Sequence, residues 1–139
     1  MKNLLDTSLH HIFTEYGFEV KKCKSLPKHE GYTSEIPYLN EKREERVATI
    51  WVQKATLKKL CSLLIFEDNP DEATMEDMTK ELANLIVGHA KMLAHNQNLE
   101  FDIKLPRFTG IRKPNPKLET LMYKIENRCL LIQTEETNG

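Results

Sequence analysis

The chain has 139 residues, of which 40% are hydrophobic and 29% are charged, and its formal net charge is −1 at pH 7. These values predict a single globular domain over residues 1–139 with one core. The balanced charge gives no reason to expect binding to nucleic acid or to a membrane surface. The apolar runs are far shorter than the roughly 20 residues of a membrane span, and the N-terminal residues lack the apolar region of a signal peptide.

The three cysteines, Cys23, Cys61 and Cys129, are odd in number and widely spaced. This pattern argues for reduced thiols in a cytoplasmic protein rather than for a disulfide framework or a zinc site. We therefore expect a cytoplasmic location and no metal or cofactor bound by this chain. Cys61 falls among apolar residues at helical spacing, which predicts a position in the core.

The first half of the chain predicts two helices and a group of strands. Apolar spacing predicts a helix over 2–15 and strands over 18–24, 33–39 and 47–52. Pro37 cannot donate to a strand ladder, so the second of these strands is expected at a sheet edge. Residues 55–66 predict a helix, with a strand over 63–66 as the alternative. Trp51, inside the third strand, is expected in the core.

The second half predicts a long helix over 71–98, a strand over 99–105 ended by Pro106, and a loop over 107–117. Strands over 119–125 and 129–135 follow as a terminal hairpin, and residues 136–139 are expected to fray. Because the strands come in groups, the sequence predicts an α+β fold. In this fold a mostly antiparallel sheet packs against a long central helix and two shorter helices.

The long helix organises this arrangement, because its apolar and polar residues fall on different sides. Asp71 and Thr74 are the candidate caps at its start. Its larger apolar residues fall within a sector of roughly 100°: Met75, Met78, Leu82, Leu85, Ile86 and Leu93. Its polar sector spans roughly 80° and holds Asp77, Glu81, Asn84, Gly88, Lys91 and His95.

Glu81 and Asn84 are three residues apart, so their side chains lie one turn apart on one face. Gly88 leaves the next turn bare, although glycine inside a helix costs about 1 kcal/mol relative to alanine. Close approach of another chain would offset that cost. We therefore interpret this face as a docking surface with two fixed polar groups, flanked by Lys91 and His95 as further candidate binding residues.

Several other polar residues have ordinary explanations. Periodicity alone is also compatible with a solvated helix face at Glu81 and Asn84. His89 falls in the apolar sector and is expected to be partly buried rather than catalytic, and the adjacent His10 and His11 point to different sides of a helix. Two basic clusters are interpreted as solvated surfaces: Lys21, Lys22, Lys24 and Lys28, and Lys104, Arg107, Arg112, Lys113 and Lys117.

The segment E-L-A-N-L-I-V-G-H-A-K, followed by a strand ending L-P-R-F-T-G, resembles the CheC/CheX family of bacterial chemotaxis phosphatases. That family shows E-x-x-N-x-x-x-G-x-A on a long helix, then a strand closing in a proline and, a few residues on, a glycine. The matching positions are Glu81, Asn84, Gly88, Ala90, Pro106 and Gly110. The resemblance covers about residues 45–135, and the single motif resembles the CheX branch.

The resemblance implies a phosphatase that hydrolyses the phosphoaspartate of a CheY-like response regulator in two-component signalling. Asn84 would orient the attacking water, Glu81 would engage the regulator's active-site lysine, and Gly88 would admit its loops. The Mg²⁺ is expected on the regulator, and the CheX branch implies a homodimer built by joining sheets. The alternatives are a non-catalytic adaptor that binds a response regulator or a flagellar motor component, and a dimeric structural module.

Overall fold

The computed structural model describes residues 1–135, so the fraying expected for residues 136–139 lies outside the described residues. The described chain forms three helices and a seven-stranded sheet. The elements are α1 (Lys2–Glu15), β1 (Val20–Lys22), β2 (Gly31–Leu39), β3 (Glu45–Val52), α2 (Lys54–Ile65), α3 (Glu72–Asn96), β4 (Asp102–Ile103), β5 (Arg107–Arg112), β6 (Glu119–Ile125) and β7 (Arg128–Thr134).

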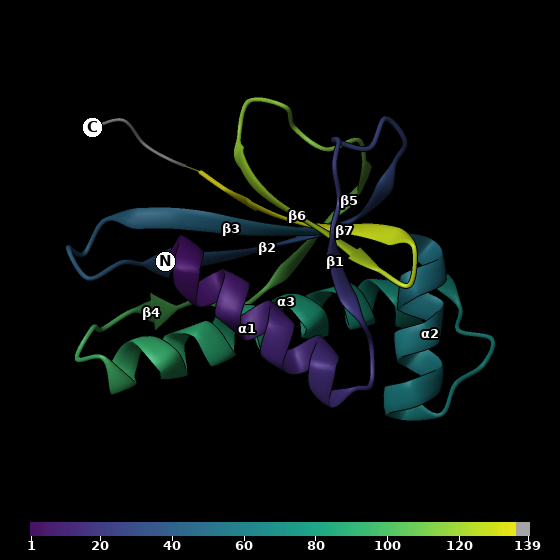
Figure 1. Ribbon diagram of the computed structural model, residues 1–139, viewed down its shortest axis with the longest axis horizontal. Helices are drawn as coiled ribbons and strands as arrows, with labels where there is room; N and C mark the ends of the chain where they lie inside the picture. The colour runs from purple at the N-terminus through teal and green to yellow at the C-terminus, as the bar shows by residue number, and fades with distance from the viewer. Residues whose placement is uncertain (136–139) are drawn as a thin grey trace.

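The sheet has the order β1-β6-β7-β3-β2-β4, with β5 also paired to β2, and each of these pairings is antiparallel. Helices α1 and α3 lie together on one side of the sheet, and α2 lies at one end (Figure 1). The loops before β2 and before β6 rise on the other side. The predicted α+β fold with three helices is therefore confirmed.

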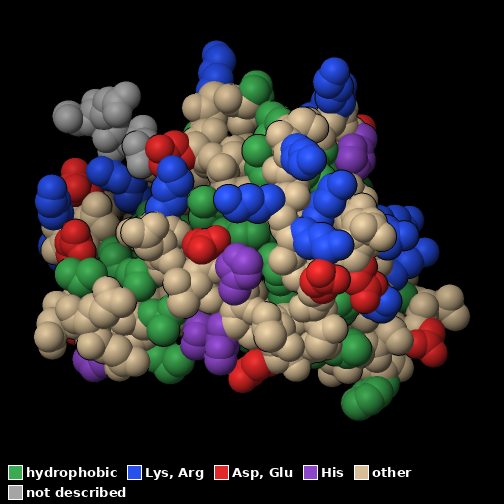
Figure 2. All heavy atoms as spheres, viewed as in Figure 1, with side chains coloured by type: hydrophobic (Ala, Val, Ile, Leu, Met, Phe, Trp, Pro, Cys, Tyr) green, Lys and Arg blue, Asp and Glu red, His purple; other side chains and the backbone are tan. Residues whose placement is uncertain are grey.

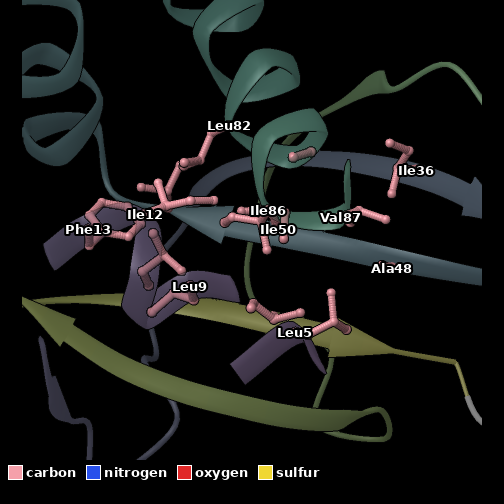
Figure 3. Close-up of a cluster of buried hydrophobic side chains, with 14 of the residues drawn as sticks. Leu5, Leu9, Ile12, Phe13, Ile36, Ala48, Ile50, Leu82, Ile86 and Val87 are labelled. Carbon is pink, nitrogen blue, oxygen red and sulfur yellow. The ribbon is translucent and has the colours of Figure 1, made fainter. Parts of the chain in front are cut away.

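The core lies between the sheet and the two packed helices. Figure 3 shows side chains from α1, α3 and the sheet gathered in one cluster. Leu5, Leu9 and Phe13 from α1 and Ile86 from α3 are fully buried there, over Ile50 of β3. The apolar stripe predicted for residues 2–15 therefore fills the space between the long helix and the sheet.

On the second face of the sheet, Trp51 is fully buried, as predicted. Its indole Nε1 donates to the carbonyl of Arg112 at 2.8 Å, and the ring of His29 stands edge-on to it. Gly31 is essential to this packing, since a Cβ at that position would lie 2.4 Å from Trp51 Cε2.

The edge position predicted from Pro37 is wrong, because β2 is an internal strand. Pro37 pairs with Val47 of β3 on one side, and its carbonyl accepts from Lys104 N on the other. In a strand the N and C=O of one residue point the same way. The missing N–H of Pro37 therefore faces the gap between β4 and β5, where no ladder bond is lost.

The strand predictions at 18–24 and 99–105 are too long, because only Val20–Lys22 and Asp102–Ile103 are paired. The loop predicted over 107–117 is wrong in its first half, where Arg107–Arg112 forms β5 against β2. Gly110 marks a register irregularity in this pairing. Because glycine is common both at bulges and in loops, the sequence of this strand is typical of a loop.

The expectation of reduced thiols is wrong for two of the three cysteines, because Cys23 and Cys129 form a disulfide with Cα atoms 6.1 Å apart. The pairing of β1 with β6, and of β6 with β7, brings together residues separated by 106 positions. Sequence spacing carries no sign of this contact. Cys61 is the free cysteine and is buried, as predicted. The argument from the cysteines for a cytoplasmic location therefore does not hold.

Among the described residues, the helices do not combine the length and the apolar character that crossing a membrane requires.

Reduction of the Cys23–Cys129 disulfide is expected to lower the free energy of unfolding by about 2–4 kcal/mol, because the bond restricts the unfolded chain. Urea denaturation with and without a reductant measures this difference. The Cys129→Ser variant is the control and is expected to match the reduced protein and to be insensitive to the reductant. Equal stability of the oxidised and reduced wild-type protein would contradict the linkage.

Candidate functional site on the exposed face of α3

The N-terminal end of α3 is fixed by contacts from its own cap and from two other elements. Asp71 caps the helix, as predicted, and accepts from Thr74 N at 2.8 Å. The hydroxyl of Tyr32 on β2 donates to Glu72 at 2.7 Å, and Lys54 of α2 forms an ion pair with the same carboxylate. Burial, and then the hydrogen bond to Glu72, raise the pKa of Tyr32 to about 12. The tyrosine therefore remains a donor at neutral pH.

The middle of α3 is fixed by α1 through a buried polar contact. Ser8 has no exposed surface, and its hydroxyl donates to the carbonyl of Ile86 at 2.6 Å. A larger side chain at position 8 would push the two helices apart. Since α3 is held by the sheet on one side and by α1 on another, only the face turned away from both remains open to solvent.

That face carries Glu81, Asn84 and Gly88. The first two side chains are exposed and Gly88 is partly exposed. Within residues 1–135, neither Glu81 nor Asn84 forms a side-chain hydrogen bond or an ion pair. A Cβ added at Gly88 would meet no heavy atom within 4 Å. The structure thus places a carboxylate, a carboxamide and a bare turn next to one another, all available to a partner.

The other two predicted binding residues lie further along the helix and are less available. His95 is roughly 17 Å beyond Asn84 along the axis, and its Nδ1 lies 2.9 Å from Glu100 in an ion pair of the same chain. Lys91 is partly buried and lies close enough to Asp102 to help lower the pKa of that carboxyl, after the larger effect of Arg43. The site therefore centres on Glu81, Asn84 and Gly88.

His89 borders the exposed face on the side toward α1. Its ring stacks on that of His11, with centroids 4.6 Å apart and planes inclined by 8°. His11 in turn lies 3.3 Å from Glu15. Burial, followed by the charge that His11 can carry, lowers the pKa of His89, and Glu15 opposes the shift. His89 is thus a partly buried histidine in a helix contact.

The sequence pattern did not predict a groove that lies beside Glu81. It has a volume of about 520 Å³, and its apolar walls come from the ends of α1 and α2 and from α3. We call it the α2–α3 groove; its lining includes Tyr16, Leu64, Ile65, Met78 and Leu85. The sequence feature that could have indicated this groove is the run L-L-I-F at residues 63–66. Four consecutive apolar positions surround a helix, so the core-facing side cannot bury all of them.

The Lys and Arg residues of the two predicted basic clusters are all exposed. Figure 2 shows that Lys and Arg side chains on this side of the molecule gather over the sheet and its loops, whereas few lie over the helices. Arg107 forms an ion pair with Glu35 and Lys104 with Glu45. No group of three or more His, Cys, Asp or Glu side chains within residues 1–135 is arranged to hold a metal ion.

The fold and the exposed E-x-x-N face define an α+β protein that presents two polar side chains from a rigid central helix. The family model for "Chemotaxis phosphatase CheX" matches residues 45–118, which include all of α3. The chain belongs to the CheX family. A comparison with curated protein sequences gives no match.

Solved structures show the same fold at low sequence identity. A CheX from Desulfovibrio desulfuricans superposes with a TM-score of 0.73 at 12% identity over 96% of each chain. A CheX from Vibrio vulnificus gives 0.72 at 17% identity over 95% of each chain. The CheX–CheY–BeF3–Mg²⁺ complex from Borrelia burgdorferi gives 0.63 at 20% identity, over 95% of this chain and 92% of that one.

Gly88→Ala is expected to raise the free energy of unfolding by roughly 0.5–1 kcal/mol, because alanine favours the helix and its Cβ finds open space. Gly31→Ala is the matched control, and contact with Trp51 is expected to lower the same quantity by about 1–3 kcal/mol. Urea denaturation measures both. A loss of stability in Gly88→Ala would mean that the chain itself requires this glycine.

Protonation of His89 is expected to reduce stability as the pH falls. Its folded-state pKa is lowered from the ordinary 6.5, so the folded chain binds fewer protons than the unfolded chain in the window just below that value. The stability is complete above about 6.5 and is lost as the pH falls toward the lowered pKa. In thermal unfolding between pH 7.5 and 5, His89→Gln should show a shallower pH dependence. A wild-type slope in His89→Gln would contradict the assignment.

Proposed function

We propose that this chain is a phosphatase that hydrolyses the phosphoaspartate of a CheY-like response regulator. The observation that carries the proposal is the exposed, unpaired pair of Glu81 and Asn84 beside the bare turn at Gly88. Membership of the CheX family supports it. The structure of a related CheX with CheY, BeF3 and Mg²⁺ supports a CheY-like partner.

The reaction needs a water molecule aligned with the bond that breaks. Water attacks phosphorus, the bond between phosphorus and the aspartyl oxygen breaks, and the aspartate leaves as a carboxylate. The protons of the water stay with the inorganic phosphate and the solvent. The Asn84 carboxamide can both donate to and accept from that water. Its role is to orient the nucleophile rather than to remove its proton, as the water-orienting glutamine does in GTPases.

Glu81 and Gly88 serve docking in this proposal. The Glu81 carboxylate pairs with the lysine of the regulator's active site and sets the register of the complex, one turn from Asn84. The bare turn at Gly88 lets the regulator's loops approach the helix. The Mg²⁺ belongs to the regulator, and no step is assigned to it here. The homodimer and the cytoplasmic location remain predictions.

Asn84→Ala is expected to reduce phosphate release from a phosphorylated CheY-like receiver by about 100-fold or more, because misplaced water loses the alignment that the amide provides. Fold and docking should persist, since Asn84 is exposed and its side chain forms no hydrogen bond or ion pair within the described chain. Asn96→Ala, another exposed asparagine on α3, is the matched control and should keep full activity. Phosphate release and receiver binding are measured in parallel.

Two outcomes would contradict the proposal. Full activity of Asn84→Ala would remove the assigned role of the amide. Binding of activated receivers by the wild-type protein without any acceleration of phosphate release would instead favour a non-catalytic adaptor.

A further inference from the structure

Phe66, which follows the last residue of α2, has a backbone conformation that is unusual for any residue except glycine. Phe66 has φ +58° and ψ +32°, in the left-handed region that glycine normally occupies at this position. A bulky side chain is strained there. The Phe66 side chain is 89% exposed, so the chain gains almost no burial in return. Such an exception to local preference is expected where a side chain serves a contact outside the chain.

Phe66 is the next residue along the chain after Ile65, at the end of α2 that borders the α2–α3 groove. Its neighbour Ile65 lines the groove and is 49% exposed. Leu64 and Leu85 line it as well, and both pack partly against the core. A contiguous apolar surface of this kind, rimmed by polar residues, is typical of a protein interaction site.

The charge around the groove restricts what can occupy it. The lining includes the carboxylates of Asp77 and Glu81 and contains no Lys, Arg or His. Lys80 forms an ion pair with Asp77 at 3.2 Å, whereas Glu81 has no such partner among the described residues. An apolar side chain flanked by a lysine or an arginine is therefore the complementary occupant.

The groove is continuous with the proposed docking face, because Glu81 belongs to both. Leu85 follows Glu81 by one turn on the groove side, and Asn84 lies on the other side of the same carboxylate. A receiver domain that engages Glu81 thus covers the groove at the same time. This continuity favours the receiver over a second copy of the chain as the occupant.

Resting on the proposed function, we propose that the α2–α3 groove and Phe66 seat an apolar segment of the docked receiver, flanked by a basic residue. The contact lies away from the reacting atoms. It supplies binding energy that selects the receiver and leaves the alignment of the water to Asn84. Ile65 and Phe66 are therefore positioning residues for the complex, distinct from Asn84.

The test uses the CheY-like receiver domains encoded in the same genome, each loaded with Mg²⁺ and beryllofluoride for binding and phosphorylated for turnover. Ile65→Ser is expected to weaken binding roughly tenfold and leave the saturated turnover rate unchanged. Leu63→Ser is the matched control: it lies on the same helix and is 44% exposed, but it does not line the groove. It should bind as the wild type does.

Phe66→Gly is a second variant that separates docking from stability. It removes the aromatic ring and relieves the left-handed backbone, so binding should weaken while the thermal midpoint stays the same or rises.

Three results would overturn the proposal in distinguishable ways. Wild-type affinity in both Ile65→Ser and Phe66→Gly, with the wild-type protein active, would reject the groove and leave the proposed function intact. A wild-type protein that neither binds nor dephosphorylates any receiver would reject the proposed function and the groove's occupant together. Self-association of the chain that is lost in Ile65→Ser would assign the groove to a second copy.

Discussion

The structure depends on the wedging of α3 between α1 and the sheet. The buried residues of α3 span about half of the helix circumference, and the Ser8 hydroxyl bonds the carbonyl of Ile86 from the α1 side. Rotation of the helix by one residue would bury a charge or expose the core. The direction in which Glu81 and Asn84 point is therefore set by core packing alone. Neither residue needs a contact within the chain to hold the orientation of its backbone.

Gly88 and Phe66 break local rules in opposite senses. Gly88 occupies the interior of a helix where the structure leaves room for a side chain, and Phe66 occupies a left-handed backbone position suited to glycine. Each choice makes the isolated chain less stable than the obvious replacement would. Gly88 lies on the α3 face that carries Glu81, and Phe66 directly follows Ile65, which lines the groove beside Glu81. Selection for something other than stability accounts for both exceptions at once, and contact with a partner is such a requirement.

The sequence predicted the elements in which apolar residues recur at regular spacing. It did not predict the features that depend on which strands pair with one another. The three helices, the terminal hairpin and the Asp71 cap follow from local spacing and are confirmed. Strand β5 was predicted as a loop because the glycine at its bulge, Gly110, is typical of loops. The strand of Pro37 was predicted at an edge because the sequence does not show that β4 and β5 leave a gap opposite this residue. The contact of Cys23 with Cys129 arises from strand order in the same way. The exposure of Glu81 and Asn84 agrees with the predicted polar sector, whereas the adjoining groove depends on how α2 packs.

A side chain that orients a water molecule works best when it is held rigidly. Little conformational entropy of the side chain is then lost when the partner and the water bind. The position of Asn84 suits that task better than a loop would. It lies near the middle of a 25-residue helix whose start is capped by Asp71 and tied to β2 and α2 through Glu72. Motion of the amide is thus reduced to its own side-chain torsions, which a docked partner can restrain. The proposed groove contact adds to docking from the exposed end of α2, where apolar side chains can adapt to a partner without disturbing the helix that holds the amide.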